Sequence, residues 1–265
     1  MRKYLRVISN VIQESSAYRL NHFLSFLCVA VPLIAIIFLW RTIYAGVSTI
    51  KGYSESMMIT YYLLSTWLAD LTGITLLWEI TSDIKDGNLS VYLLRPMSYQ
   101  LYQLSAKLGV SLPYSLIGAG IIIIFVISFA RDFFIPSNLL SIPLFLLTAF
   151  LGALLAFQFS YLLSLSAFWL EESSAIQLFV EIFTLLLSGA LLPLNLFPTL
   201  IYKMMEKLPF QYLIYFPINI YLGRRVRGVE IAKGMILEIA WIIILQALIA
   251  LIWRRGVRRY SAVGG

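Results

Sequence analysis

The chain has 265 residues, of which 60% are hydrophobic and 12% are charged, and this composition excludes an ordinary soluble domain, where about a quarter of residues are charged. The length suits a single domain, 1–265, because no Ser/Gly/Pro-rich linker marks a second one. The net charge of +7 does not indicate nucleic acid as a partner, because basic residues gather at both chain ends, a pattern typical of the cytoplasmic face of a membrane and of anionic lipid.

Residues 1–20 are predicted to form an amphipathic helix at the membrane interface. At 100° per residue, the apolar side chains fall on one arc, and Arg2, Lys3 and Arg6 lie on the opposite face. A basic polar face suits a helix in the cytoplasmic headgroup layer. A membrane anchor and a coupling element are both compatible with this pattern. The apolar arc contains Tyr4, Leu5, Val7, Ile8, Val11 and Ile12.

Long apolar runs recur six times along the chain, with short polar segments between them. A bilayer core roughly 30 Å thick needs about 20 apolar residues of α-helix, because an open structure of any other kind leaves backbone groups unsatisfied in lipid. We therefore predict an all-α, multi-pass protein of the cell inner or plasma membrane with six transmembrane helices and both termini cytoplasmic. The runs are 23–40, 58–80, 108–129, 139–170, 176–192 and 235–253.

The loop at 82–97, after the second run, is predicted to contain a short helix. Gly87 suits the left-handed end of the preceding helix, Asn88 is a good N-cap, and Pro96 ends a helix predicted over 89–95. A helix this short is unstable in water, so it must dock on its own bundle or on a soluble partner. Leu89, Tyr92 and Leu93 lie on one face of this helix and are predicted to form an apolar ridge exposed on the cytoplasmic side.

Carboxylates inside apolar runs are expensive and point to function. A charge at the bilayer centre costs at least roughly 2.5 kcal/mol, so Asp70 and Glu181 should face the bundle, a cavity or a partner subunit. A functional role and a structural hydrogen bond between helices both remain open for this pair. Glu79 and Glu238 lie nearer the ends of their runs, where snorkelling to the interface accounts for them.

Residues 193–222, after the fifth run, are predicted to form an outer helical cap. A helical stretch before Pro209 is too short to span, and Pro217 interrupts the next apolar stretch, so both suit interfacial or re-entrant helices. One face of the first stretch carries Leu200, Ile201, Met204, Met205 and Leu208.

Motifs for catalysis and for metal binding are absent from the sequence. No Gly-x-x-x-x-Gly-Lys-Ser/Thr loop occurs, so this chain lacks that means of binding a nucleotide phosphate. Cys28 and His22 are the single cysteine and histidine, which excludes an intrachain disulfide and makes a metal site improbable. We therefore predict no enzyme activity and no cofactor in this chain.

Four segments in this order resemble the type 2 ABC transporter permeases, the membrane subunits of exporters whose ATPase is a separate chain. They are the amphipathic start, Asp-Gly-Asn-Leu-Ser-Val-Tyr-Leu-Leu-Arg-Pro at 86–96, Ser-Gly-Ala-Leu-Leu-Pro-Leu at 188–194 with Leu-Pro-Phe at 208–210, and Arg-Arg-Tyr-Ser-Ala-Val-Gly-Gly at 258–265. The chain looks most like a subgroup with a C-terminal Tyr-x-x-Val-Gly-Gly tail. Arg224, Arg225 and Arg227, predicted outside, depart from the generic pattern.

The resemblance implies a half-transporter that pairs with a second copy or a related permease and recruits two ABC ATPase subunits, which would bind ATP and Mg. The translocation path or dimer interface would then lie near Asp70 and Glu181. The loop after the second run would be the coupling helix, and the acidic turn at 171–172 a second, smaller contact. The residues expected to contact the ATPase are Lys85, Asp86, Gly87, Asn88, Leu89, Tyr92, Leu93, Arg95, Pro96, Glu171 and Glu172.

Three other interpretations remain. A docking, sensor or immunity subunit would bind an ATPase without moving cargo, and the energy-coupling membrane subunit of a vitamin importer would carry Ala-Arg-Gly-like motifs, which this sequence lacks. A membrane enzyme is the third alternative. The sequence does not identify a substrate, because a mostly apolar path suits lipids, drugs, peptides and lipid-linked sugars equally.

Overall fold

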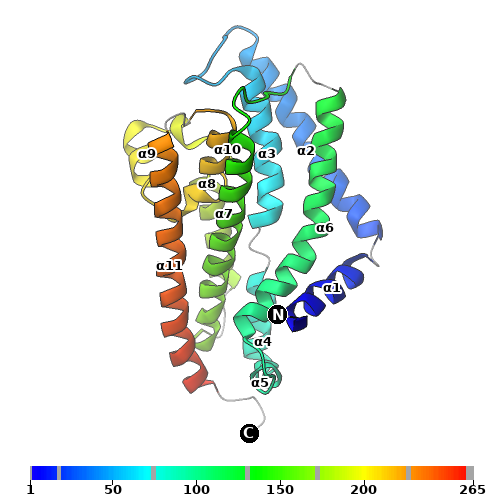
Figure 1. Cartoon of the computed structure of the whole chain (residues 1–265), viewed down its shortest axis with the longest axis vertical. Helices are drawn as coiled ribbons and strands as arrows, with labels where there is room; N and C mark the ends of the chain where they lie inside the picture. Colours follow the sequence, from blue (N-terminus) through cyan, green and yellow to red (C-terminus); the bar gives the residue numbers. More distant parts are fainter. Residues whose placement is uncertain are drawn as a thin grey trace.

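The computed structural model shows an elongated bundle of helices (Figure 1). Its described part consists of helices and turns, apart from one isolated bridge between Ile50 and Tyr53, so the all-α prediction is confirmed there. The described residues are 2–16, 19–72, 76–128, 132–170, 174–224 and 228–260.

Each of the six apolar runs contains helix. Hydrophobic side chains dominate these segments, and a helix satisfies the backbone groups between its ends without help from water. The helices are α2 (Arg19–Tyr44), α3 (Glu55–Thr72) followed by α4 (Leu76–Lys85), α6 (Tyr99–Ser128), α7 (Ser141–Ser164) with the 3-10 turn η1 (Leu165–Phe168), α8 (Ser174–Leu187) and α11 (Gly228–Arg259).

Three helices in the described ranges are long and apolar enough to cross a bilayer: Tyr99–Ser128, Ser141–Phe168 and Gly228–Arg259. In the second run, α3 is described up to Thr72 and α4 from Leu76, and residues 73–75 lie outside the described part. Helix α8 has 14 residues, fewer than the roughly 20 that a perpendicular span requires. A membrane-type helical bundle is thus established, whereas six complete spans stay a prediction.

The two ends of the bundle carry different elements. At the lower end of Figure 1 lie α1 (Arg2–Ser16), α5 (Leu89–Leu93) and the C-terminal end of α11. At the upper end lies the segment predicted as the outer cap, formed by η2 (Leu194–Leu196), α9 (Thr199–Met205), η3 (Pro209–Tyr212) and α10 (Tyr215–Tyr221).

The amphipathic N-terminal segment forms α1 and packs against α6. Val11 lies so close to Gly109 that a methyl group added at this glycine would be 2.7 Å from the Val11 Cβ. Leu5, on the same predicted apolar arc, is 63% exposed. The apolar arc is therefore divided between α6 and the outside.

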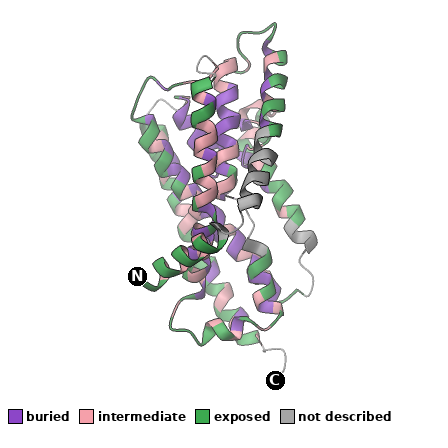
Figure 2. Cartoon of the chain, turned by 90° about the vertical axis from the view of Figure 1, so that its right-hand side faces the viewer, coloured by how far each residue is buried: buried purple, intermediate pink, exposed green. Residues whose placement is uncertain are grey.

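Helix α10 lies inside the protein, where it packs against α7 and α3, and all of its residues are buried. Figure 2 shows how buried residues gather on the inner faces of the bundle, whereas much of α1 and of the turn around α5 is exposed. Two tyrosines of α3 hold the segment that follows α8: the Tyr61 hydroxyl donates to the Gly189 carbonyl at 2.6 Å, and the Tyr62 hydroxyl donates to the Leu191 carbonyl at 2.7 Å.

Gly152 marks the closest approach between α7 and the cap. A Cβ at this position would lie 2.5 Å from the backbone oxygen of Tyr212, an atom that cannot move without displacing η3. Gly120 in α6 offers a matched control, because nothing lies within 4 Å of a Cβ built there.

We predict that Gly152→Ala destabilises the protein by about 1–3 kcal/mol, because the added methyl group overpacks a backbone contact. Gly120→Ala should leave stability unchanged or raise it slightly, because alanine is the better helix former. Thermal unfolding of the detergent-purified variants measures both effects. Equal melting temperatures for the two variants would contradict the packing described here.

Candidate functional site

The turn that precedes α5 is built as the sequence predicts at Gly87. This residue has φ of 81°, a conformation that glycine adopts without the steric cost of a Cβ, and α4 ends two residues before it. The Asn88 side chain makes no capping hydrogen bond, contrary to its predicted role. The Ser90 hydroxyl instead donates to the Gly87 carbonyl at 2.7 Å.

The predicted apolar ridge of Leu89, Tyr92 and Leu93 is wrong for its first two members. Leu89 is fully buried, and Tyr92 is half-buried, because this side of α5 packs onto the bundle. Leu89 belongs to the lower core, a cluster of residues from α4, α6, α7, η1 and α11 that includes Ile80, Ile84, Tyr99, Tyr161, Leu165 and Ile249. Docking on its own bundle therefore stabilises this short helix.

A different apolar surface points outward. Leu94 is 87% exposed, Val91 is 51% exposed and Leu93 is 43% exposed. Val91 and Leu94 are three residues apart and so share one side of the helical turn. We call Val91, Leu93 and Leu94 the exposed patch of α5. Val91 and Leu94 were not among the residues predicted to be exposed, although their spacing indicates a second apolar face.

Aromatic contacts anchor the inner side of α5. The Tyr92 ring centroid lies 5.2 Å from that of Tyr99 and 4.9 Å from that of Tyr102, and the Arg95 guanidinium lies 5.0 Å from the Tyr92 centroid. Burial raises the pKa of the Tyr92 hydroxyl well above its ordinary value, so this group is neutral at physiological pH.

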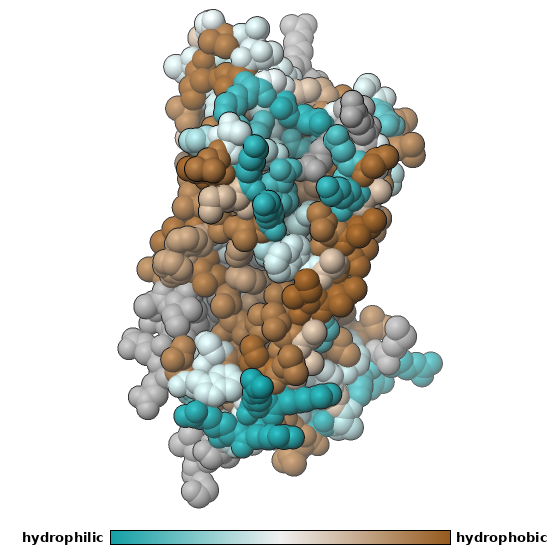
Figure 3. All heavy atoms as spheres, turned by 90° about the vertical axis from the view of Figure 1, so that its left-hand side faces the viewer, coloured by the Kyte–Doolittle hydropathy of each residue, from teal (hydrophilic) through white to brown (hydrophobic). Residues whose placement is uncertain are grey.

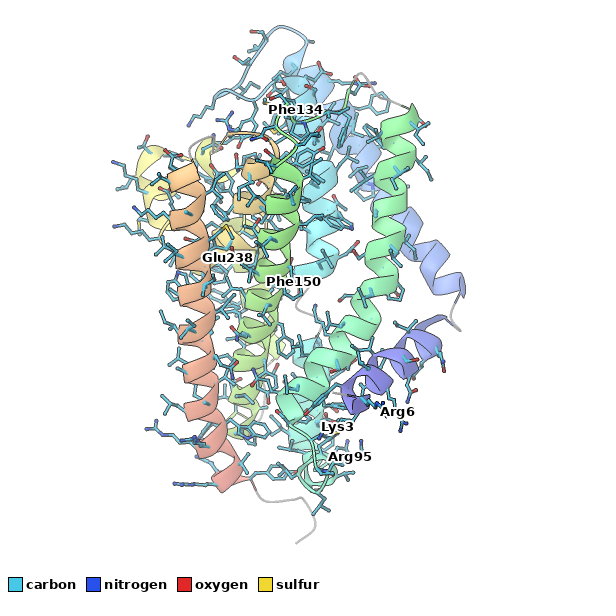
Figure 4. The ribbon with its side chains drawn as sticks, in the orientation of Figure 1. Lys3, Arg6, Arg95, Phe134, Phe150 and Glu238 are labelled. Atoms are coloured by element: carbon cyan, nitrogen blue, oxygen red, sulfur yellow. The ribbon has the colours of Figure 1, made fainter. Side chains whose placement is uncertain are left out.

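Helix α1 is hydrogen-bonded to the loop that contains α5. The Lys3 ammonium donates to the Pro96 carbonyl, and the Ser98 N–H donates to the Tyr4 hydroxyl at 3.1 Å. Figure 4 shows Lys3 and Arg95 together at this lower end. Helix α1 is thus joined to the 85–98 loop, which is distant from it in the sequence and leads directly into α6.

The remaining predicted coupling residues have varied positions. Lys85 is half-buried at the end of α4, and Asp86 is exposed and accepts a hydrogen bond from the Ser82 hydroxyl. Pro96 is exposed. Glu171 and Glu172, predicted as a second contact, lie outside the described residues.

The structure places the two membrane carboxylates in separate surroundings. Asp70 is half-buried and lines a small cavity formed with Leu33 of α2, Trp67 of α3 and Gly118 of α6. Glu181 is exposed on α8 and does not line that cavity. Its neighbours on α8 are exposed apolar residues: Leu178, Phe179, Ile182, Phe183 and Leu185.

The expectation that Glu79 and Glu238 both snorkel to an interface is wrong for Glu238. Glu79 is exposed, whereas Glu238 is fully buried, and neither of its carboxylate oxygens has a hydrogen-bond partner in the described part of the chain. The reason is its helix face: Gly234, one turn earlier, touches Phe216 of α10, so this side of α11 faces the bundle.

Comparison with protein families agrees with this architecture. The family described as "ABC-2 family transporter protein" matches residues 30–264, which is nearly the whole chain. Comparisons with curated proteins and with solved structures give no match. The long apolar helices and the family match lead to one conclusion: the chain belongs to the ABC-2 transporter family and is a membrane permease subunit of an ABC transporter.

Proposed function

We propose that this permease is half of an ABC exporter, in which two permeases form the translocation path and separate ATPase subunits supply the force. The observation that carries the proposal is the exposed patch of α5. This apolar surface belongs to a helix that Leu89 and Tyr92 hold against the bundle. Complete burial of a leucine contributes about 1.5–3 kcal/mol. Burial of the exposed Leu94 in a groove of a soluble partner would therefore favour binding by itself.

The contacts that hold α5 to the bundle would transmit a movement of the ATPase to the membrane helices. Leu89 fastens α5 to residues of α4, α6, α7 and α11, and the bonds from Lys3 and Tyr4 fasten the loop to α1. A displacement of α5 would therefore move several helices together rather than bend one loop. Alternating access by rigid-body movement requires this kind of connection.

The charges at the ends of the chain support a cytoplasmic position for α5. The last turns of α11 contain Arg254, Arg255, Arg258 and Arg259, and this end of α11 lies at the same end of the bundle as α1 and α5. Basic residues next to membrane helices favour the cytoplasmic side. A multi-pass protein with both termini in the cytoplasm follows, with the outer cap on the opposite side.

A second permease, either another copy or a related chain, is proposed to cover α8. An ionised carboxylate in lipid costs at least roughly 2.5 kcal/mol, and Glu181 lies among exposed apolar side chains. Contact with a partner subunit removes that exposure. Asp70 then adjoins the path through the cavity between α2, α3 and α6.

ATP hydrolysis belongs to partner chains in this proposal. Two ATPase subunits, one for each permease, bind ATP and Mg, and the permease contributes no catalytic residue. The sequence supports this division because it contains no Walker A loop.

We predict that Leu94→Asp abolishes stimulation of the partner ATPase, because it places a charge in an apolar contact. Loss of one leucine contact corresponds to roughly tenfold weaker binding or more. Leu139→Asp is the control, since Leu139 is 72% exposed in the loop before α7, at the opposite end of the bundle. ATP hydrolysis by reconstituted complexes measures the effect, and full stimulation by Leu94→Asp would refute the docking assignment.

We also predict that Asp70→Asn lowers export about tenfold, equivalent to roughly 1.4 kcal/mol, while the complex assembles normally. The change removes a charge beside the path and keeps the side-chain shape. The readout is export of the amphiphile that most stimulates the wild-type ATPase, and co-purification with the ATPase measures assembly. Glu79→Gln is the matched control, and wild-type export by Asp70→Asn would leave Asp70 a purely structural role.

A further inference from the structure

A cavity of about 680 Å³ opens at the upper end of the protein, between the outer cap and α11. Figure 3 shows hydrophilic residues gathered on this part of the surface, above a hydrophobic belt. The volume is typical of small-molecule sites, which range from about 300 to 1,000 Å³. Its walls include Asn195 of η2, Tyr202 of α9, Asn219 of α10 and Trp241 of α11.

Charged groups of both signs line this cavity. Lys207 and Lys233 are exposed, and their ammonium groups have no hydrogen bond or ion pair within the described ranges. Glu206 and Glu230 line the same cavity. Arg224 is already engaged, because its guanidinium donates to the carbonyls of residues 51 and 52 and lies 3.8 Å from the Tyr53 ring centroid. The two lysines suit a phosphate, and the mixture of signs suits a zwitterion better than a simple anion.

Deeper groups in the same region are acceptors without donors. Gln211 lies in the cavity wall and is 2% exposed; its side-chain nitrogen donates to the Glu206 carbonyl, but its oxygen Oε1 accepts no hydrogen bond in the described part of the chain. Buried polar atoms of this kind are rare and call for a partner.

Glu238 is a buried carboxyl group on the same side of α11, next to the cavity but not part of its lining. Gly234 and Trp241, four residues before it and three after it, both line the cavity, so Glu238 shares their face of α11. Figure 4 shows Glu238 in the upper half of this helix. Both of its oxygens lack a hydrogen-bond partner among the described residues. An ammonium group suits the unpaired oxygens of Gln211 and Glu238, because it brings three donors. It is also attracted to the faces of the aromatic rings that line the cavity.

We propose that this cavity binds a zwitterionic headgroup that carries a phosphate and a primary ammonium. The phosphate contacts Lys207 and Lys233, and the ammonium reaches Gln211 and Glu238. Such a headgroup occurs on membrane lipids and in soluble phosphoethanolamine. The surface of α11 favours the lipid, because Leu237 lines the cavity and the exposed Ile244 and Leu248 continue the same face of the helix, which offers a path for acyl chains.

The test uses the purified full-length permease without an ATPase, so it does not depend on the proposed export function. Short-chain phosphatidylethanolamine, phosphatidylglycerol and phosphatidylcholine of equal chain length are titrated, and binding is followed by native mass spectrometry. We expect the ethanolamine lipid to bind about tenfold more tightly than the other two, because only its headgroup has ammonium N–H donors. Equal affinity for the three lipids in the wild-type protein would overturn the proposal without any variant.

Two variants locate the site. Lys207→Met combined with Lys233→Met should weaken binding of the ethanolamine lipid about tenfold, whereas Lys203→Met, on the same cap but outside the cavity lining, should not. Glu238→Gln should reduce the preference for ethanolamine over glycerol headgroups. Unchanged binding by the double variant would overturn the assignment.

Competition with soluble phosphoethanolamine distinguishes the two sources of the headgroup. Displacement of the lipid at similar concentrations supports a soluble ligand, and a failure to displace supports the lipid. Melting temperatures of the variants, measured in the same detergent, separate a loss of binding from a loss of folding.

Discussion

Backbone hydrogen-bonding groups within a bilayer need partners inside the protein, and this constraint explains why the chain is helical along most of the bundle. The long helices α6, α7 and α11 satisfy this constraint with the backbone hydrogen bonds inside each helix. After α8 the chain leaves helical geometry, and there the hydroxyls of Tyr61 and Tyr62 donate to the carbonyls of Gly189 and Leu191. The buried helix α10 begins beside this segment, where the Tyr215 N–H donates to the Ser188 carbonyl at 3.0 Å.

The lower end shows how one buried leucine positions an exposed surface. Leu89 and the ring of Tyr92 hold α5 against the bundle, which leaves Val91 and Leu94 outside. The same residues that stabilise the short helix therefore decide which of its faces a partner can reach. The bonds from α1 to the loop extend this rigid unit to the N-terminal segment.

The upper end has a different chemistry. Polar and aromatic side chains of the cap meet α11 around a cavity, and Glu238 lies buried beneath it on the bundle-facing side of that helix. The exposed patch of α5 and the polar cavity thus lie at opposite ends of the permease, and in the two proposals above the first binds an ATPase and the second a lipid headgroup. Helix α11 connects the two ends of the protein. It contributes Ile249 to the lower core, where Leu89 holds α5, and Trp241 to the cavity.

Features that depend on neighbours along the chain could be predicted from the residues alone. Apolar runs of membrane length, the amphipathic pattern of α1 and the left-handed turn at Gly87 all follow from local composition and backbone sterics. Which side of a helix is covered depends instead on how distant helices pack. Leu89 and Leu94 have the same side chain, as do Glu79 and Glu238, yet one member of each pair is buried and the other exposed. The residues that cover Leu89 and Glu238 come from distant helices, and no local pattern reveals how those helices pack.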